Sequence, residues 1–167
     1  MPLGNELKLK TPIGVLEHEA VLNIYYTASK IKKRADEFFN EYGLTDVQFN
    51  VLMLLATQAN SRGGLSQAQI GEMMLVNRAN ITALIDRMEK AGLVARASSA
   101  DDRRSNIIKM TNKGRKLFDQ AEPLYYRQIE KLMLGIKTAE QKRVIEVLER
   151  IRAGLQTNGQ RNFNRKE

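Results

Sequence analysis

Apolar residues recur at intervals of three and four over most of the chain, the spacing of amphipathic helices. Over residues 13–42 this pattern contains no Gly or Pro after Gly14, which predicts one long helix. Gly43 supplies a natural C-terminal cap. Thr45 and Gln48 then have the spacing of a capping box, so a second helix is expected over DVQFNVLMLLATQ.

Two further helices are predicted after the break at NSRGG. Ser66 and Gln69 repeat the capping-box spacing in front of the short segment QAQIGEMM. A two-residue turn, Leu-Val, leads to Asn77, a good N-cap residue. The fourth helix should reach Ala91 and end at Gly92.

After Gly92 the apolar period changes from 3.6 to 2, the period of a β-strand. The segments LVARA and NIIKM are short, alternating and separated by the polar run SSADDRRS, which predicts a β-hairpin with a mobile loop. In the register that turns Ile108 and Met110 toward the core, Ile107 and Lys109 face outward.

The helical period returns from Thr111 to Leu134, with a kink expected near Pro123 because proline removes a backbone donor. Thr138 and Gln141 predict a third capping box in front of AEQKRVIEVLERIRAGL, followed by a frayed, basic tail. Three helices followed by a two-stranded hairpin is the order of a winged helix-turn-helix. The fold class expected is therefore mainly α: a winged helix-turn-helix with additional N- and C-terminal helices.

The composition excludes several kinds of metal and catalytic site. The 167 residues contain no cysteine and one histidine, His18, so disulfides, thiolate metal sites and clustered imidazole ligation within one chain are excluded. No nucleophile elbow, glycine-rich phosphate loop or Ser/His/Asp set is present, which argues against an enzyme. The chain also lacks a signal-peptide pattern and a membrane-spanning apolar run, so a cytosolic protein is expected.

Positive charge is concentrated in one part of the chain. The net charge is +8, and residues 87–116 hold nine basic and three acidic residues, which accounts for +6. A surplus of this kind favours nucleic acid or another anionic surface as partner. A basic adaptor for an acidic protein or a membrane surface would also explain the charge, but it would leave the hairpin unexplained.

The fourth helix has two different faces. Its apolar stripe is Ile81, Leu84, Ile85 and Met88. The other face is small and polar, which suits a helix in the major groove because short side chains let the backbone approach the bases. A solvated helix surface would show the same pattern. The residues of this face are Arg78, Ala79, Asn80, Thr82, Ala83, Asp86 and Arg87.

The hairpin tip carries Asp101, Asp102, Arg103 and Arg104. An arginine there could cross the phosphate backbone into the minor groove, where the negative potential favours a guanidinium. We expect Asp102 to pair with Arg104 and shape the loop while Arg103 reaches outward. A charged turn of zero net charge is the alternative.

Together these segments resemble a known family. The run DDRRSNIIKMTNKG is similar to the wing signature of the MarR family of bacterial regulators, with its Asp-x-Arg, apolar strand and Leu-Thr-x-x-Gly. The matching positions here are Asp102, Arg104, Met110, Thr111 and Gly114, with Met110 in place of the usual leucine. NRANITALIDRMEKAGLVAR resembles that family's recognition helix and first wing strand, and LTDVQFNVLMLL its second helix.

The resemblance covers roughly residues 13–155 and implies a homodimer that binds a pseudo-palindromic operator, usually as a repressor released by a small ligand. It implies four segments: an N-terminal dimerisation helix with a flexible leader (1–42), the winged helix-turn-helix (43–114), C-terminal dimerisation helices (115–155) and a flexible basic tail (156–167). The DNA contacts expected are Ser66, Gln67, Asn77, Arg78, Ala79, Asn80, Thr82, Ala83, Arg87, Arg103, Arg104, Ser105 and Lys109.

Apolar stripes on the terminal helices agree with a dimer. One is Val144, Val147, Leu148, Ile151 and Leu155, and the other is Val21, Ile24, Ala28, Ile31, Ala35 and Phe38. Packing within one chain is the alternative. The resemblance also implies a site for a small aromatic or phenolic ligand, although core packing explains the same side chains equally well. The candidates are His18, Tyr25, Tyr26, Phe49, Met53 and Phe118. No cofactor or metal is expected.

Overall fold

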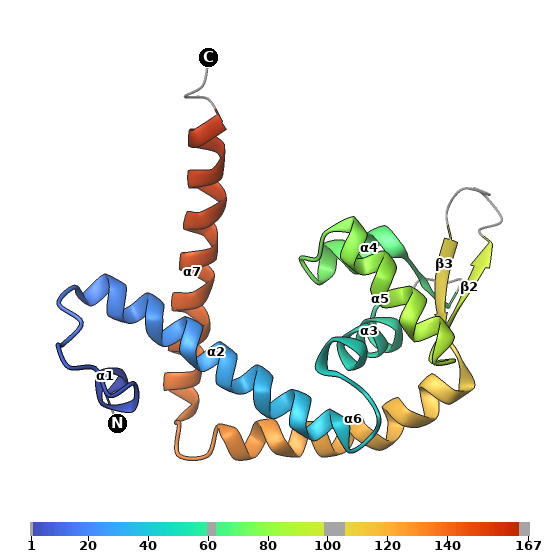
Figure 1. Ribbon diagram of the computed structural model, residues 1–167, viewed down its shortest axis with the longest axis horizontal. Helices are drawn as coiled ribbons and strands as arrows, with labels where there is room; N and C mark the ends of the chain where they lie inside the picture. Colours follow the sequence, from blue (N-terminus) through green and yellow to red (C-terminus); the bar gives the residue numbers. More distant parts are fainter. Residues whose placement is uncertain (1, 60–62, 99–105, 164–167) are drawn as a thin grey trace. The chain divides into compact units, whose positions relative to one another are not determined.

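The computed structural model describes residues 2–59, 63–98 and 106–163, and most of these are helical. The elements are α1 (Leu3–Glu6), α2 (Leu16–Asn40), α3 (Asp46–Thr57), β1 (Leu65–Ser66), α4 (Gln67–Met73), α5 (Arg78–Lys90), β2 (Val94–Ser98), β3 (Asn106–Met110), α6 (Asn112–Leu132) and α7 (Thr138–Phe163). The chain, traced in Figure 1, divides into two compact units, residues 1–125 and 126–167.

Three of the predicted helix caps are confirmed. Thr45 begins α3 with a complete capping box, in which its hydroxyl accepts from the Gln48 N–H at 3.2 Å and the Gln48 side chain accepts from the Thr45 N–H at 2.9 Å. Ser66 begins α4 in the same way. The side chain of Asn77 accepts from the N–H of Asn80 at 2.9 Å and begins α5. The bonds of Ser66 and Asn77 fix where α4 and α5, the two helices of the helix-turn-helix, start.

An aromatic cluster joins α2, α3 and α6 at the base of the first unit. The rings of Phe39 and Phe49 stack at 4.2 Å between centroids, and those of Phe49 and Phe118 at 5.6 Å. Tyr125 lies 5.1 Å from Phe49 on the same measure. The hydrophobic core continues from this cluster into α4, α5 and the sheet, so the helix-turn-helix packs on these aromatic rings.

The sheet has three strands rather than the predicted two. β3 lies between β1 and β2 and is antiparallel to both, with Arg96 opposite Ile108 and Ser66 opposite Ile107. The prediction that Ile107 faces outward was wrong, since its side chain is 8% exposed. The physical reason is β1: a Cβ added to Gly64 would lie 2.6 Å from the Ile107 side chain, so the β1 segment covers it.

The joint between the wing and α6 explains the Thr-x-x-Gly pattern. The hydroxyl of Thr111 donates to the Gly92 carbonyl at 2.6 Å and accepts from the N–H of Gly114 at 3.0 Å. A Cβ on Gly114 would lie 2.2 Å from the carbonyl oxygen of Leu93, so only glycine fits. α6 then continues through Pro123 to Leu132.

The remaining helices depart from expectation at their ends. The capping box predicted at Thr138 and Gln141 was wrong: Thr138 is already helical, and the Glu140 carboxylate accepts from the N–H of Lys137 at 2.8 Å. α7 continues to Phe163, whereas the sequence predicted fraying after Leu155. Near the N-terminus, the expected leader contains α1, whose Glu6 pairs with Lys30 of α2 at 2.8 Å.

Candidate nucleic-acid interface

The helix α5 is oriented by its buried stripe. Ile81, Leu84, Ile85 and Met88 are all buried, as predicted, and they fix which side faces solvent. The opposite side presents exposed Arg78, Ala79, Asn80, Ala83, Asp86 and Arg87, with Thr82 half-buried beside them. Two alanines and short polar side chains leave the first turns of this helix open to close approach.

The N-terminal turn of α5 combines exposure with free backbone donors. Arg78, Ala79 and Asn80 lie in the first turn, where the backbone N–H groups have no acceptor within the helix. The Asn77 side chain satisfies one of these donors, the N–H of Asn80. A helix N-terminus with an arginine beside it attracts phosphate through the helix dipole and the guanidinium charge.

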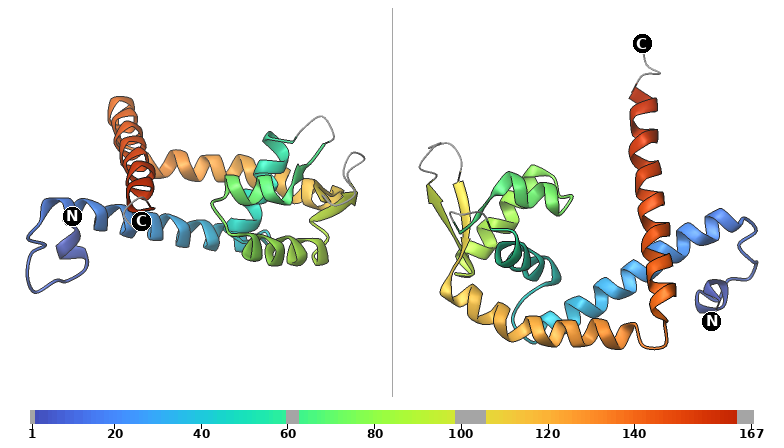
Figure 2. Two further views of the ribbon diagram at one scale, coloured as in Figure 1. Left: turned by 90° about the horizontal axis from the view of Figure 1, so that it is seen from above. Right: turned by 180° about the vertical axis from the view of Figure 1, so that it is seen from behind.

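α4 packs against α5 and contributes its own first residues (Figures 1 and 2). Ser66 caps α4, and the next residue, Gln67, donates from its amide to the hydroxyl of Thr82 at 2.5 Å. The structure therefore places the predicted contact Gln67, which follows Ser66, beside the predicted contact Thr82 of α5.

An ion-pair cluster that the sequence analysis missed joins α5 to the wing. Arg96, in β2, lies 2.5 Å from carboxylate oxygens of both Asp86 and Glu89. Its backbone N–H also donates to Glu89 at 2.9 Å. The hydrogen bond from the Arg96 backbone N–H, followed by the one from its guanidinium, holds the pKa of the Glu89 carboxyl below its usual range. Arg96 lies opposite the buried Ile108 and on the same face of β2 as the buried Val94, so strand alternation turns it toward α5 and its two acids. The signal in the sequence is an arginine at a core-facing position of LVARA.

The wing is described only in its strands. Lys109 lies on β3 opposite Ala95 and is exposed, as predicted. Asp102, Arg103, Arg104 and Ser105 lie outside the described residues, and their predicted roles stay predictions. Lys113 at the start of α6 donates to the carbonyl of Ala91 at 2.7 Å, so this cation satisfies the C-terminal end of α5.

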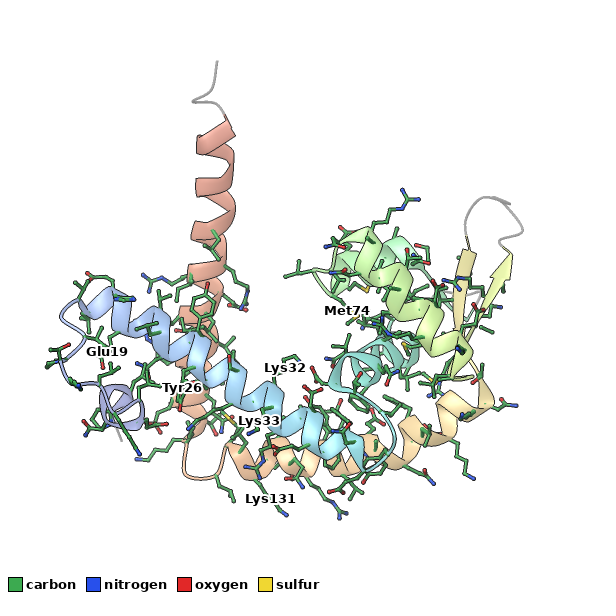
Figure 3. The ribbon with its side chains drawn as sticks, in the orientation of Figure 1. Glu19, Tyr26, Lys32, Lys33, Met74 and Lys131 are labelled. Carbon is green, nitrogen blue, oxygen red and sulfur yellow. The ribbon has the colours of Figure 1, made fainter. Side chains whose placement is uncertain are left out.

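The six ligand candidates fall into two groups. Phe49 and Phe118 are buried in the aromatic cluster, and Met53 packs against the same core. On α2, His18 and Tyr25 are exposed. Tyr26, labelled in Figure 3, is half-buried, and the Lys30 ammonium lies 4.7 Å from its ring centroid. The structure brings the first three together and leaves the others on the N-terminal half of α2.

Within the described part of the chain, no helix is both long and apolar enough to cross a membrane, and no group of three or more His, Cys, Asp or Glu side chains is placed to hold a metal ion.

Comparisons with known proteins agree with this geometry. A family model described as the MarR family matches residues 42–105. The chain is 30% identical over 138 residues to the uncharacterized HTH-type transcriptional regulator YkoM of Bacillus subtilis (strain 168), covering 80% of this chain and 87% of that protein.

Two solved structures share the fold. The S. aureus MepR–DNA complex matches with a TM-score of 0.75 at 20% identity, covering 81% of this chain and 97% of that one. CouR from Rhodococcus jostii RHA1, bound to p-coumaroyl-CoA, matches with a TM-score of 0.69 at 22% identity, covering 83% and 94%.

Proposed function

The chain belongs to the MarR family of transcriptional regulators, and from this premise we propose that it is a homodimeric repressor of a nearby operon, released from its operator by a small ligand. It is a DNA-binding regulator with a winged helix-turn-helix, and it is not an enzyme. Since the operator would be chromosomal, the proposal places the protein in the cytoplasm.

One observation carries the proposal: the exposed first turn of α5, with Arg78, Ala79 and Asn80, stands on a helix whose opposite face is fully buried. The helix can enter a major groove without disturbing its own packing, and Gln67 and Ser66 accompany it from α4. Lys109 and the wing-tip residues Arg103, Arg104 and Ser105 would reach the neighbouring backbone or minor groove.

A dimer is supported by apolar side chains that stay exposed on the terminal helices. On α7, Val144, Ile151 and Leu155 are 52%, 40% and 70% exposed, and on α2 Val21 and Ile31 are 45% and 41% exposed. Rows of exposed apolar side chains at helical spacing are typical of subunit interfaces. A two-fold dimer would set its recognition helices about 34 Å apart, which suits two half-sites of a pseudo-palindrome.

The ligand part of the proposal rests on the family and on aromatic side chains of α2, α3 and α6. CouR was solved with p-coumaroyl-CoA bound. We therefore propose an aromatic or phenolic effector for this chain, and the candidate contacts from the two groups described above are His18, Tyr25, Tyr26, Phe49, Met53 and Phe118.

The test is a binding series on duplex DNA selected from a random pool, repeated at increasing salt. Counterion release predicts a log–log slope of about −0.9 per phosphate neutralised. Arg103→Ala should weaken binding to most sequences about equally, whereas Arg78→Ala should change the preferred sequence. An affinity that ignores salt, or that is equal for heparin and every DNA sequence, would contradict the proposal and favour a basic adaptor.

A further inference from the structure

Thr82 has its hydroxyl fixed by two neighbours. Its Oγ1 lies 2.8 Å from the carbonyl oxygen of Arg78, one turn earlier in α5. It also lies 2.5 Å from Nε2 of Gln67, the first residue of α4. The side chain is half-buried on the face of α5 that the proposed function turns toward DNA.

These two contacts determine where the hydroxyl proton is. A carbonyl oxygen can only accept, so Thr82 must donate its single proton to Arg78. With that proton used, the short contact to Gln67 requires the amide NH₂ to be the donor. A hydroxyl has two lone pairs, and one of them is now taken. Thr82 is left with one lone pair and no free proton.

A hydroxyl in this state cannot bind a phosphate, since phosphate oxygens only accept hydrogen bonds. It differs in this respect from Arg78 and Asn80, whose side chains carry several donors. Whatever Thr82 contacts in the major groove must itself be a donor.

We propose that Thr82 is a specificity-determining residue that reads amino bases and rejects keto bases. Adenine and cytosine present the exocyclic N6 and N4 amines in the major groove, and guanine and thymine present O6 and O4 at the corresponding positions. The free lone pair of Thr82 accepts from an amine but meets another lone pair at a keto oxygen. If the hydroxyl proton of Thr82 turned toward a keto oxygen, its hydrogen bond to the Arg78 carbonyl would be lost.

This inference rests on the proposed function, because it needs α5 in the major groove. It adds a rule that can be tested: in each half-site, one position on the contacted strand is A or C and not G or T. Every base pair has one amine in this groove, so the rule concerns which strand carries it.

The first experiment selects duplexes from a random pool with the full chain and with Thr82→Val, which has the same shape without the hydroxyl. We expect the wild-type pool to show the A-or-C position and the Thr82→Val pool to lose it while keeping the rest of the site. Thr82→Ser, which retains a hydroxyl at the same place, should keep it. An unchanged preference in the Thr82→Val pool would overturn the inference.

The second experiment changes only the DNA, so it does not depend on a variant that folds. Adenine at the selected position is replaced by purine, which lacks the 6-amino group. Wild-type affinity should fall roughly three- to tenfold, the value of one hydrogen bond, and Thr82→Val should be indifferent. Equal losses for both proteins would overturn the inference. If the wild-type chain enriches no sequence at all, the proposed function fails, and the inference fails with it.

Discussion

The carboxylate of Glu89 accepts hydrogen bonds from both the backbone N–H and the guanidinium of Arg96, so α5 and the first wing strand are joined at one point. The Arg96 guanidinium is 22% exposed and contacts Asp86 as well. Solvent screens the exposed partners of this charge-assisted pair, so the pair adds little to the free energy of unfolding. Its main effect is to fix the orientation of β2 relative to α5. The relationship sets where the wing stands relative to the recognition helix.

We expect Glu89→Gln to lower the thermal midpoint at neutral pH and to have no effect in acid. Arg96 lowers the pKa of Glu89 in the folded chain, first through its backbone N–H. A carboxyl with a lowered folded-state pKa stabilises the fold above its unfolded value of about 4.3, and this contribution disappears as the pH falls through the lowered pKa. Thermal unfolding from pH 7 to pH 3 should therefore show the two curves converging below about pH 4.

The matched control for that measurement is Glu41→Gln, at an exposed glutamate away from α5 and the wing. It should follow the wild-type curve more closely at every pH. A Glu89→Gln difference that persists unchanged to pH 3 would mean that the pairing with Arg96 is not what stabilises this joint.

Gly114→Ala should be severely destabilising. Its added methyl group would lie 2.2 Å from the Leu93 carbonyl oxygen, which is backbone and cannot move aside without opening the wing joint. We expect a loss of roughly 2–4 kcal/mol in the free energy of unfolding, measured by urea denaturation. Gly154→Ala is the control: a Cβ there meets nothing within 4 Å, and alanine favours a helix, so that variant should not be destabilised. Equal behaviour of the two variants would remove the steric explanation.

Asn77→Ala and Thr45→Ala separate stability from DNA binding. Each removes a helix N-cap, and each should cost about 1 kcal/mol in the free energy of unfolding. Only Asn77 begins the helix proposed to enter DNA, so only its loss should reduce affinity for the selected duplex. Fluorescence anisotropy at a temperature where both variants are fully folded tests this. A similar loss of affinity in Thr45→Ala would mean that stability alone explains the effect.

The local signals in the sequence predicted the parts of this fold that depend on neighbouring residues. Thr45, Ser66 and Asn77 begin helices through bonds to residues three positions later, so their spacing contains the necessary information. The buried stripe of α5 follows in the same way from a 3.6-residue period.

Contacts between distant residues could not be predicted in this way. β1 pairs with β3 across about forty residues, and neither its two-residue length nor its sequence distinguishes it from a loop, so the burial of Ile107 was missed. At α7, Thr138 had the right residue type at the right spacing, but Glu140 caps the backbone one residue earlier. Two equivalent local solutions compete there, and spacing alone does not choose between them.

Ile151→Glu tests the proposed dimer and with it the spacing of the two recognition helices. Ile151 is 40% exposed on α7, in a row with Val147 and Leu155. A carboxylate buried between two apolar stripes would lose its hydration without a partner, so we expect the dimer to dissociate at micromolar concentration in sedimentation velocity runs. Lys142→Glu, half a helical turn around α7 from Ile151, introduces the same carboxylate on the other face and should leave the dimer intact.

Because two linked half-site contacts bind far more tightly than one, Ile151→Glu should also lose at least about tenfold in affinity for the full operator while keeping its affinity for a single half-site. A variant that stays dimeric would show that this stripe packs elsewhere, and a wild-type chain that sediments as a monomer while binding the full operator tightly would refute the dimer itself.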